Sequence, residues 1–457
     1  MRRTVKKWLF CCALTAACLL VTGCSFKLAA SPEDLYSLPQ LPAEYTELNN
    51  CIKALLDGGA EYAAPISGTN TQSVQLVDLN GSGQEEALAF LRNSSEEKPL
   101  KIYIFSPTGH GYEQSAVIEG NGTSFYSVSY RDLDGDGEME LLIGWKVGAD
   151  QQALTVYTLR NGKPEELLRT NYVKYAVTNL DERRPESELV VFQADDEGNS
   201  VADFYTWEKD GGLGTLSKTS SARLSMTMAE LNAGRVSSGF LRDGVPALFV
   251  SGVSDSSVEI TDILLLREGE MTNAVLSDTT GVTTELFRYQ FLFPMDINGD
   301  NITEVPAPTP LPSHGNLLEF SYLISWRSYD QSGVSTTVGY TYHNNDDGWY
   351  LEVPEKWVEK IVATRSRSAA DEIAVTFSVR GVTEEDDRDF LRIYTITGDS
   401  RDIKATRGDR IILGRQAETI YAAELLSENS QWSGGIQEDD LRSRFKLITS
   451  EWRPGDN

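Results

Sequence analysis

Short apolar runs, separated by glycine, asparagine and proline, recur through the middle of the chain. Runs such as "ELLIGWKV" (140–147), "ALTVYTLRNGK" (153–163) and "EALAFLRN" (86–93) are rich in β-branched and aromatic residues. Runs of this length and composition, bounded by turn residues, are typical of β-strands. The pattern therefore predicts a mainly β protein.

The strand-like runs belong to a repeat of about fifty to sixty residues. "VDLNGSGQEEALAFLRN" begins at Val77, "RDLDGDGEMELLIGWKV" at Arg131 and "MDINGDNITEVPAP" at Met295. Eroded copies begin at Thr178 and near Phe240, and each keeps a turn followed by an apolar run. With the run that precedes each loop, a unit has four strands, which is the pattern of a propeller blade.

This repeat resembles the FG-GAP or VCBS repeats of integrin-type β-propellers, and it covers about residues 66–345. The resemblance implies a β-propeller of about five blades over residues 61–345. More blades would need strands from the C-terminal region.

Each complete loop places oxygen-bearing side chains at positions one, three and five, and a glutamate at position nine. Together with the carbonyl of position seven, these oxygens suit a hard cation, and Gly at position six allows the sharp turn. In the fifth copy Asn301 takes that place, which is tolerable because Asn visits left-handed backbone conformations. An EF-hand closes at position twelve, whereas this shorter loop resembles the integrin-type blade loop. The predicted ligands are Asp132, Asp134, Asp136, the Glu138 carbonyl and Glu140 in the second copy; Asp296, Asn298, Asp300, the Ile302 carbonyl and Glu304 in the fifth; and Asp78, Asn80, Ser82, the Gln84 carbonyl and Glu86 in the first.

The predicted ion is Ca²⁺, in a structural role, because Mg²⁺ demands a stricter octahedral geometry. The number of carboxylates ranks the second loop above the fifth and the fifth above the first. The alternative is an acidic turn that holds water and no metal.

The N-terminus has the form of an export signal. Four basic residues precede an apolar run, and Val21-Thr22-Gly23-Cys24 follows. This ending resembles the lipobox of bacterial lipoproteins. The resemblance implies removal of residues 1–23, lipidation of Cys24, and a tether plus helix over residues 24–60. Membrane lipid would then be one partner, and the exported protein would sit on the outer face of the bacterial plasma membrane, with an outer membrane also possible. The alternative is an ordinary secretory signal with a chance cysteine.

Composition limits the classes of molecule that the protein can bind. Loss of the four basic residues takes the formal net charge from −27 to −31. Such an acidic surface repels phosphates, which argues against binding of nucleic acid. Of the five cysteines only Cys51 would remain unmodified, so no intramolecular disulfide can form.

Two flanks complete the predicted architecture. "AEYTELNNCIKALLDGG" predicts a helix with Tyr45, Leu48, Ile52 and Leu55 on one face. Residues 346–457 predict a small α+β domain that ends in an amphipathic helix through Leu441, Phe445, Ile448 and Trp452. That domain faintly resembles the Mog1/PsbP-like domains. The alternating prolines of "VPAPTPLP" (305–312) predict an edge strand or an extended loop.

No catalytic motif stands out, and the three histidines lack metal-ligand spacing. The sequence therefore favours a binding or scaffold protein for an unknown extracellular protein or glycan over an enzyme. One alternative is a surface hydrolase or lyase that acts on polysaccharide or cell-wall material. Another is an accessory subunit of an envelope complex.

Overall fold

The computed structural model describes residues 45–448, except 150, 161, 211–212, 278, 284, 289–291 and 312–320. The predicted signal peptide, Cys24 and most of the tether lie outside these residues. Within the described part of the chain, no helix is long and apolar enough to cross a bilayer.

The described residues form six antiparallel sheets and a few short helices, which confirms the predicted mainly β class. The first sheet contains β1 (Glu61–Tyr62), β2 (Val74–Val77), β3 (Glu86–Arg92), β4 (Leu100–Thr108) and β5 (Gly111–Gly120); the second contains β6 (Ser124–Arg131), β7 (Glu140–Lys146), β8 (Gln152–Arg160) and β9 (Lys163–Tyr172); the third contains β10 (Lys174–Thr178), β11 (Glu188–Ala194), β12 (Ser200–Asp210) and β13 (Leu213–Arg223).

The fourth sheet contains β14 (Arg235–Phe240), β15 (Pro246–Val253), β16 (Val258–Arg267), β17 (Glu270–Asn273) and β18 (Leu286–Arg288); the fifth contains β19 (Val305–Pro310), β20 (Tyr322–Tyr329), β21 (Ser335–Asn344), β22 (Trp349–Val353) and β28 (Phe445–Leu447); the sixth contains β23 (Ile361–Ala369), β24 (Glu372–Val379), β25 (Arg388–Ile396), β26 (Ile411–Arg415) and β27 (Ile420–Leu425). The α-helices are α2 (Thr46–Asp57), α3 (Met228–Asn232), α4 (Arg401–Ala405), α5 (Ser427–Gln431) and α6 (Glu438–Arg444), and 3₁₀ turns cover Glu355–Trp357 and Glu384–Asp386.

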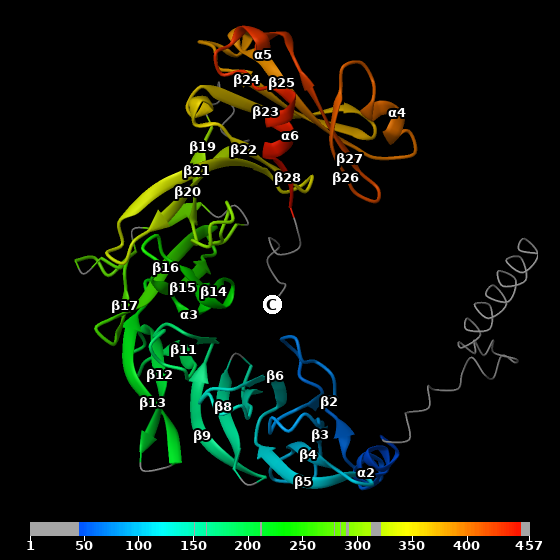
Figure 1. Ribbon diagram of the computed structural model, residues 1–457, viewed down its shortest axis with the longest axis vertical. Coiled ribbons are helices and arrows are strands. Elements are labelled where there is room, and N and C mark those ends of the chain that lie inside the picture. The colour runs from blue at the N-terminus through cyan, green and yellow to red at the C-terminus, as the bar shows by residue number, and fades with distance from the viewer. Residues whose placement is uncertain are drawn as a thin grey trace, which may run out of the picture.

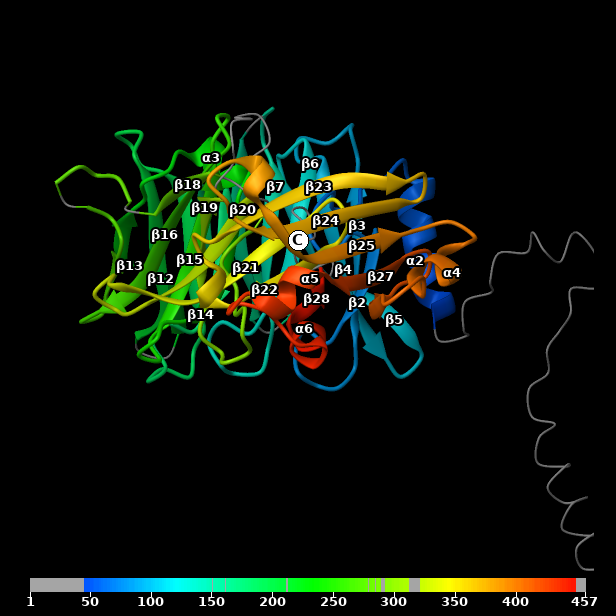
Figure 2. The same cartoon turned by 90° about the horizontal axis from the view of Figure 1, so that it is seen from above.

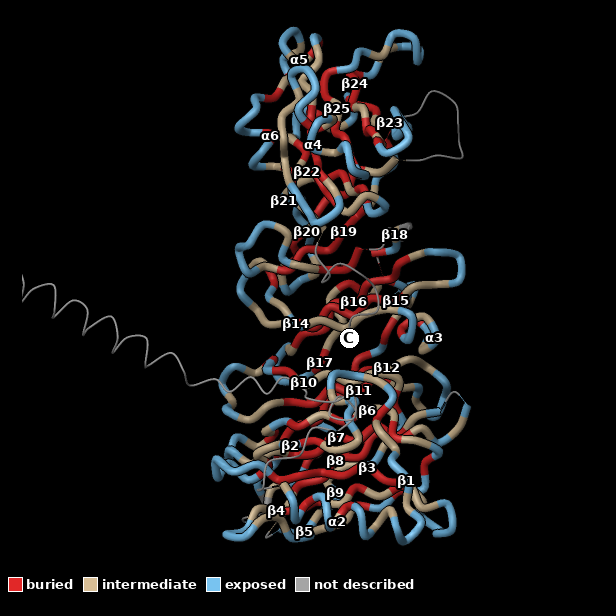
Figure 3. The backbone as a smooth tube through the Cα atoms, turned by 90° about the vertical axis from the view of Figure 1, so that its right-hand side faces the viewer, coloured by how far each residue is buried: buried red, intermediate tan, exposed pale blue. Residues whose placement is uncertain are grey.

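Consecutive sheets fan out one after another, as propeller blades do, along an arc that stays open between α2 and α4 (Figure 1). Seen from above, their strands run between two rims of loops (Figure 2). The strands that follow the loops, such as β3, β7 and β11, are buried almost throughout. β7 and β11 have a neighbouring sheet on each face, and β3 lies between the second sheet and α2. Figure 3 shows these buried strands in the interior and the exposed residues in the loops. An unbroken apolar run in the sequence therefore marks a strand buried on both faces.

A β-bulge recurs at the same place in several sheets. The pairing shifts at Phe105 between β4 and β5, at Tyr157 between β8 and β9, at Tyr205 between β12 and β13, and at Arg327 between β20 and β21. A bulge inserts one residue and increases the local twist. The shared position shows that these sheets repeat one structural unit, in agreement with the repeat read from the sequence.

Helices cover the two faces at the ends of the arc. On the first sheet, Leu48 and Ile52 of α2 pack on Ala89 and Phe105, so the predicted helical face is confirmed. On the sixth sheet, Ala405 of α4 packs against apolar residues of β24, β25 and β27. A packed helix therefore covers part of each terminal face.

The C-terminal region requires two corrections. The fifth sheet crosses the expected domain boundary after residue 345, because β22 and β28 pair within it. One hydrophobic cluster also joins the fifth and sixth sheets, so residues 346–457 do not have a separate core. The expected amphipathic helix ends at Arg444, since Phe445 pairs as a strand with Leu351. Trp452 lies outside the described residues.

The proline-rich strand β19 lies at one end of the fifth sheet's strand order, as predicted. Leu311 donates its backbone N–H to the carbonyl of Ser321, so the backbone N–H groups of the odd-numbered residues in β19 point toward β20. The backbone nitrogens of Pro306, Pro308 and Pro310 therefore point away from β20. Because proline has no N–H, this outer edge of β19 offers no hydrogen-bond donor at these three positions. The preceding segment pairs with this edge only through the bridge between Met295 and Glu304.

Candidate functional site

The three predicted cation loops lie between β2 and β3, between β6 and β7, and between the bridge residue Met295 and β19. In each loop the first aspartate folds the backbone around itself by accepting N–H groups. Asp132 accepts from Gly135 (2.7 Å) and Gly137 (3.0 Å), and Asp296 accepts from Gly299 and Asn301. Asp78 accepts from Ser82 and Gly83 in the same way. Asn301 has φ +66°, the left-handed conformation anticipated for it. The sequence motif therefore yields one local structure three times.

The second loop brings its carboxylates together. Asp132, Asp134 and Asp136 each place an oxygen within 4.8 Å of the others, a spacing that could hold one metal ion. Burial and the neighbouring Asp136 raise the pKa of Asp134. Glu140 is 1 % exposed and accepts the N–H of Leu133 at 2.8 Å. Burial raises its pKa to about 7, with the loop acids adding to the effect. A bound cation would favour the ionised form of all four carboxylates.

The fifth loop contains an unsatisfied carboxylate. Glu304 is fully buried, and its Oε2 accepts the N–H of Ile297 at 3.2 Å. Its Oε1 has no hydrogen-bond partner among the described residues. Burial, followed by the charges of Asp300 and Asp296, raises the pKa of Glu304 to about 7. Buried oxygens are normally satisfied, so this atom fits a role as a metal ligand.

The first loop is arranged differently. Glu86 accepts the N–H of Leu79 at 3.0 Å and the side-chain amide of Asn80 at 2.7 Å. The amide thus occupies an oxygen that a cation would use. This loop has internal hydrogen bonds in place of a third carboxylate, which fits its lowest place in the predicted ranking.

The third, eroded copy contains a residue that the sequence reasoning missed. Glu188 is buried and accepts the N–H groups of Leu180 (2.7 Å) and Asp181 (3.1 Å). The closing glutamates of the complete loops likewise accept the N–H of the second loop residue. Arg183 donates to both carboxylate oxygens of Asp181. A guanidinium of the chain therefore supplies positive charge in this loop. The sequence signal that could have identified this residue was a glutamate eight residues after Leu180, just before the apolar run.

Neighbouring loops are joined by backbone hydrogen bonds. Met139 donates to Leu79 at 2.7 Å, and Ser187 donates to Leu133 at 3.1 Å. In both pairs the donor directly precedes a closing glutamate and the acceptor is the second loop residue. A cation in one loop would therefore also fix the contact between adjacent sheets.

A pocket of about 640 Å³ adjoins the fifth loop. Asn298, a predicted metal ligand, lines it together with Tyr340, Glu352, Lys356 and Arg444. The wall carries both acidic and basic side chains. A ligand with groups of the opposite charge facing each of them, or a ligand rich in hydroxyls, could bind here. Because Asn298 belongs to both the loop and the pocket, occupancy of one would affect the other.

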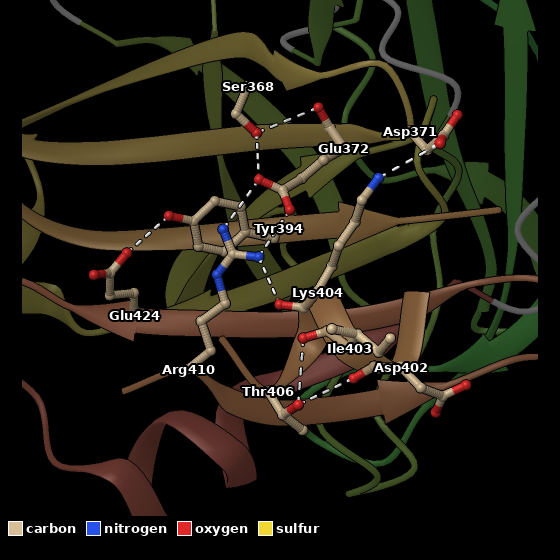
Figure 4. Close-up of polar contacts among 10 residues, drawn as sticks. All are labelled: Ser368, Asp371, Glu372, Tyr394, Asp402, Ile403, Lys404, Thr406, Arg410 and Glu424. Carbon is tan, nitrogen blue, oxygen red and sulfur yellow. Dashed lines mark hydrogen bonds and ion pairs between the residues drawn. The ribbon is translucent and has the colours of Figure 1, made fainter. Parts of the chain in front are cut away.

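A separate polar cluster lies on the end face of the sixth sheet (Figure 4). Arg410 donates to both oxygens of Glu372, at 2.8 and 3.0 Å, and its guanidinium lies 3.6 Å from the centre of the Tyr394 ring. Arg410 also donates to the carbonyl of Lys404, and this fixes the end of α4. Arg410 holds the pKa of Glu372 below its ordinary value. The cluster anchors the helix that covers this face.

Comparisons with known proteins give no family. No family model and no curated protein matches this chain. Among solved structures, a protein from Lactobacillus plantarum is similar at 12% identity and a TM-score of 0.26, over 71% of this chain and 85% of that one. Rhamnogalacturonan lyase YesW is similar at 14% identity and a TM-score of 0.28, over 68% of this chain and 60% of that one. Likenesses this weak carry no argument, so the function is argued from the site alone.

Proposed function

We propose that this chain is an exported, calcium-stabilised binding protein, built as an open FG-GAP-like propeller whose six sheets are its blades. Lipid on Cys24 would anchor it to the outer face of a bacterial membrane, and its ligand would be an extracellular glycan or protein. The convergence of Asp132, Asp134 and Asp136 above the buried Glu140 is the observation that carries the calcium part of this proposal.

Calcium would act by reducing repulsion between crowded acids and by joining neighbouring sheets. Extracellular calcium modules bind with dissociation constants of about 10⁻⁴–10⁻³ M. At about 2 mM Ca²⁺, a site of that affinity stabilises the folded state by about 0.6–2 kcal/mol. Two occupied loops would therefore raise the melting temperature by several degrees.

The pocket beside the fifth loop supports the binding part of the proposal. Asn298 would coordinate the ion and also form part of the pocket wall. Calcium would then hold this wall in one conformation, and linkage requires that a ligand in the pocket strengthen calcium binding by the same factor.

Thermal unfolding of the purified protein, in about 2 mM CaCl₂ and in EDTA, tests the metal. We expect calcium to raise the melting temperature of the parent protein and of Glu138→Gln, whose side chain is not a predicted ligand. The double variant Asp132→Asn/Asp134→Asn should lose most of the rise. Equal melting temperatures with and without calcium in the parent protein would refute the metal assignment.

Membrane fractionation tests the anchor separately. The full-length chain, expressed in a bacterium, should sediment with membranes, and Cys24→Ser should not gain the lipid. If both proteins sedimented with membranes and both were released by detergent, lipidation at Cys24 would be contradicted.

A further inference from the structure

A second pocket, of about 620 Å³, lies in the seam between the second and third sheets. β9 of the second sheet contributes Thr170 and Asn171 to its wall. β11, β12, β13 and the turn after β11 contribute the rest. Nearer the other end of this seam the two sheets pack through an apolar cluster that includes Trp207 and Leu216. The seam thus changes from apolar packing to an almost wholly polar, solvent-accessible hollow.

Asp203 is a buried carboxylate in the wall of this pocket. It lies two residues before the recurrent bulge, where the first, second and fifth sheets have Tyr103, Thr155 and Ser325. The repeat therefore places an uncharged residue at this position in those three sheets and a carboxylate in the third. The fourth sheet also has a carboxylate there, because Asp262 pairs with Val250 as Asp203 pairs with Val191. Asp262 is fully buried, and Ser225 donates to both of its oxygens. Asp203 is only 3 % exposed. A carboxylate at a buried position costs stability unless polar partners compensate it.

The partners of Asp203 form an ordered set. Gln193 donates to it at 2.7 Å, Ser221 at 2.8 Å and Lys218 at 3.4 Å. Thr170 of the second sheet in turn donates to Gln193 at 3.1 Å. The side chains are therefore held in fixed orientations across both sheets. The Lys218 side chain is 52 % exposed, so its ammonium can also reach a molecule in the pocket.

The lining indicates the class of ligand. Besides Asp203 it includes Asp195 and Asp196, against the one cation Lys218, so negative charge prevails and anionic ligands are disfavoured. A metal ion is not favoured either. Among the residues that the structure describes, only Asp132, Asp134 and Asp136 form a group of three acids close enough to hold one.

We infer that this pocket binds a neutral sugar or an amino sugar of a glycan. Carboxylates accept hydrogen bonds from sugar hydroxyls, while Lys218 and the amide of Asn171 can donate to them. An amino group on the sugar would also be attracted by Asp195 and Asp196. The inference rests on the proposed binding function, since it names the ligand class, but it uses a site distant in sequence from the fifth loop.

An oligosaccharide array tests the inference with the full protein in calcium. Its probes are neutral oligosaccharides, chito-oligosaccharides with and without acetylation, and oligosaccharides of uronic acids. We expect binding within the neutral or amino-sugar group and none to the uronic acids. Titration calorimetry with the best soluble probe should then show at least a tenfold weaker affinity for Lys218→Gln and for Asp203→Asn.

Lys218→Gln keeps the test informative if Asp203→Asn fails to fold, because Lys218 is half exposed. Lys98→Gln removes one positive charge from the loop between β3 and β4, outside both pockets, so it is the matched control and should bind as the parent protein does. A further variant, Glu355→Gln, alters the pocket beside the fifth loop. Binding that is lost in Glu355→Gln and kept in Lys218→Gln would overturn the inference but leave the proposed binding function standing. A preference for uronic acids, or no binding to any probe, would also overturn it. The proposed function itself fails only if, in addition, calcium gives no stabilisation and no extracellular protein is captured.

Discussion

Replacement of Glu259 by glutamine gives a direct test of the packing between the fourth and fifth sheets. Glu259 lies on the central strand β16 and is only 3 % exposed. Its Oε1 has no hydrogen-bond partner among the described residues. Burial raises the pKa of this carboxyl to about 8, and a hydrogen bond with Ser251 lowers it only in part. The native protein therefore keeps Glu259 protonated at neutral pH.

The raised pKa makes stability depend on pH with a definite sign. In the unfolded chain the carboxyl ionises near 4.5. Between these two values the native state binds more protons than the unfolded state, so the free energy of unfolding falls as pH rises. The advantage of the protonated carboxyl is complete below pH 4.5 and is lost by about pH 8. Each pKa unit corresponds to about 1.4 kcal/mol, so the whole loss is on the order of 5 kcal/mol.

Urea unfolding at pH 5, 7 and 9, in constant EDTA, measures this term. Glu259→Gln cannot ionise, and any cost of the buried amide is independent of pH. We therefore expect the stability of the parent protein to fall by about 3–4 kcal/mol relative to Glu259→Gln between pH 5 and pH 9. Glu270→Gln, on the exposed start of β17, controls for loss of one negative charge and should follow the parent protein. Parallel pH profiles for the parent protein and Glu259→Gln would refute the reasoning.

Three further substitutions test other parts of the structure by urea unfolding. Arg410→Met should lower the free energy of unfolding by about 3–5 kcal/mol because it leaves the buried Glu372 without its cation. Arg410→Met/Glu372→Met should recover most of that loss, and an equal loss in both variants would contradict this. Leu48→Ala should cost about 2–4 kcal/mol by opening the cover of the first sheet, and a cost below 1 kcal/mol would mean that α2 contributes little. Gly81→Ala should cost about 1–2 kcal/mol, since Gly81 has φ +66° and a Cβ there would lie 2.8 Å from the Gly137 carbonyl; an unchanged protein would show that the two loops do not need this close contact.

Local features of the fold could be predicted from the sequence. The strands around the complete loops, the face of α2 and the edge position of β19 all follow from patterns within one segment. Glycine or asparagine at the turning position of each loop likewise fixed its backbone conformation, as Asn301 shows. These features depend on interactions between residues close in sequence.

Features that depend on distant pairing were missed. Phe445 lies where a helix was expected, and it pairs instead with Leu351, almost one hundred residues earlier. The amphipathic pattern of its segment fits either structure, because Leu441 and Phe445 reach the same core from a helix and from a strand. The polar pocket around Asp203 was missed for the same reason, since its wall joins residues of two sheets. Glu188 was overlooked because its loop has Asn179 and Arg183 at positions one and five, where the second loop has aspartates.

The covered ends of the arc determine which surfaces remain for binding. Each inner sheet buries both faces against its neighbours, and a closed propeller would bury the two remaining faces against each other. Here α2 covers one and α4, fixed by Arg410, covers the other, as capping elements do in repeat proteins. Closure of the arc, or stacking of a second copy on either end, would require displacement of a packed helix. Partners are therefore expected at the loop-bearing rims and in the seams between sheets, where the acidic loops, the pocket beside Asn298 and the pocket around Asp203 lie.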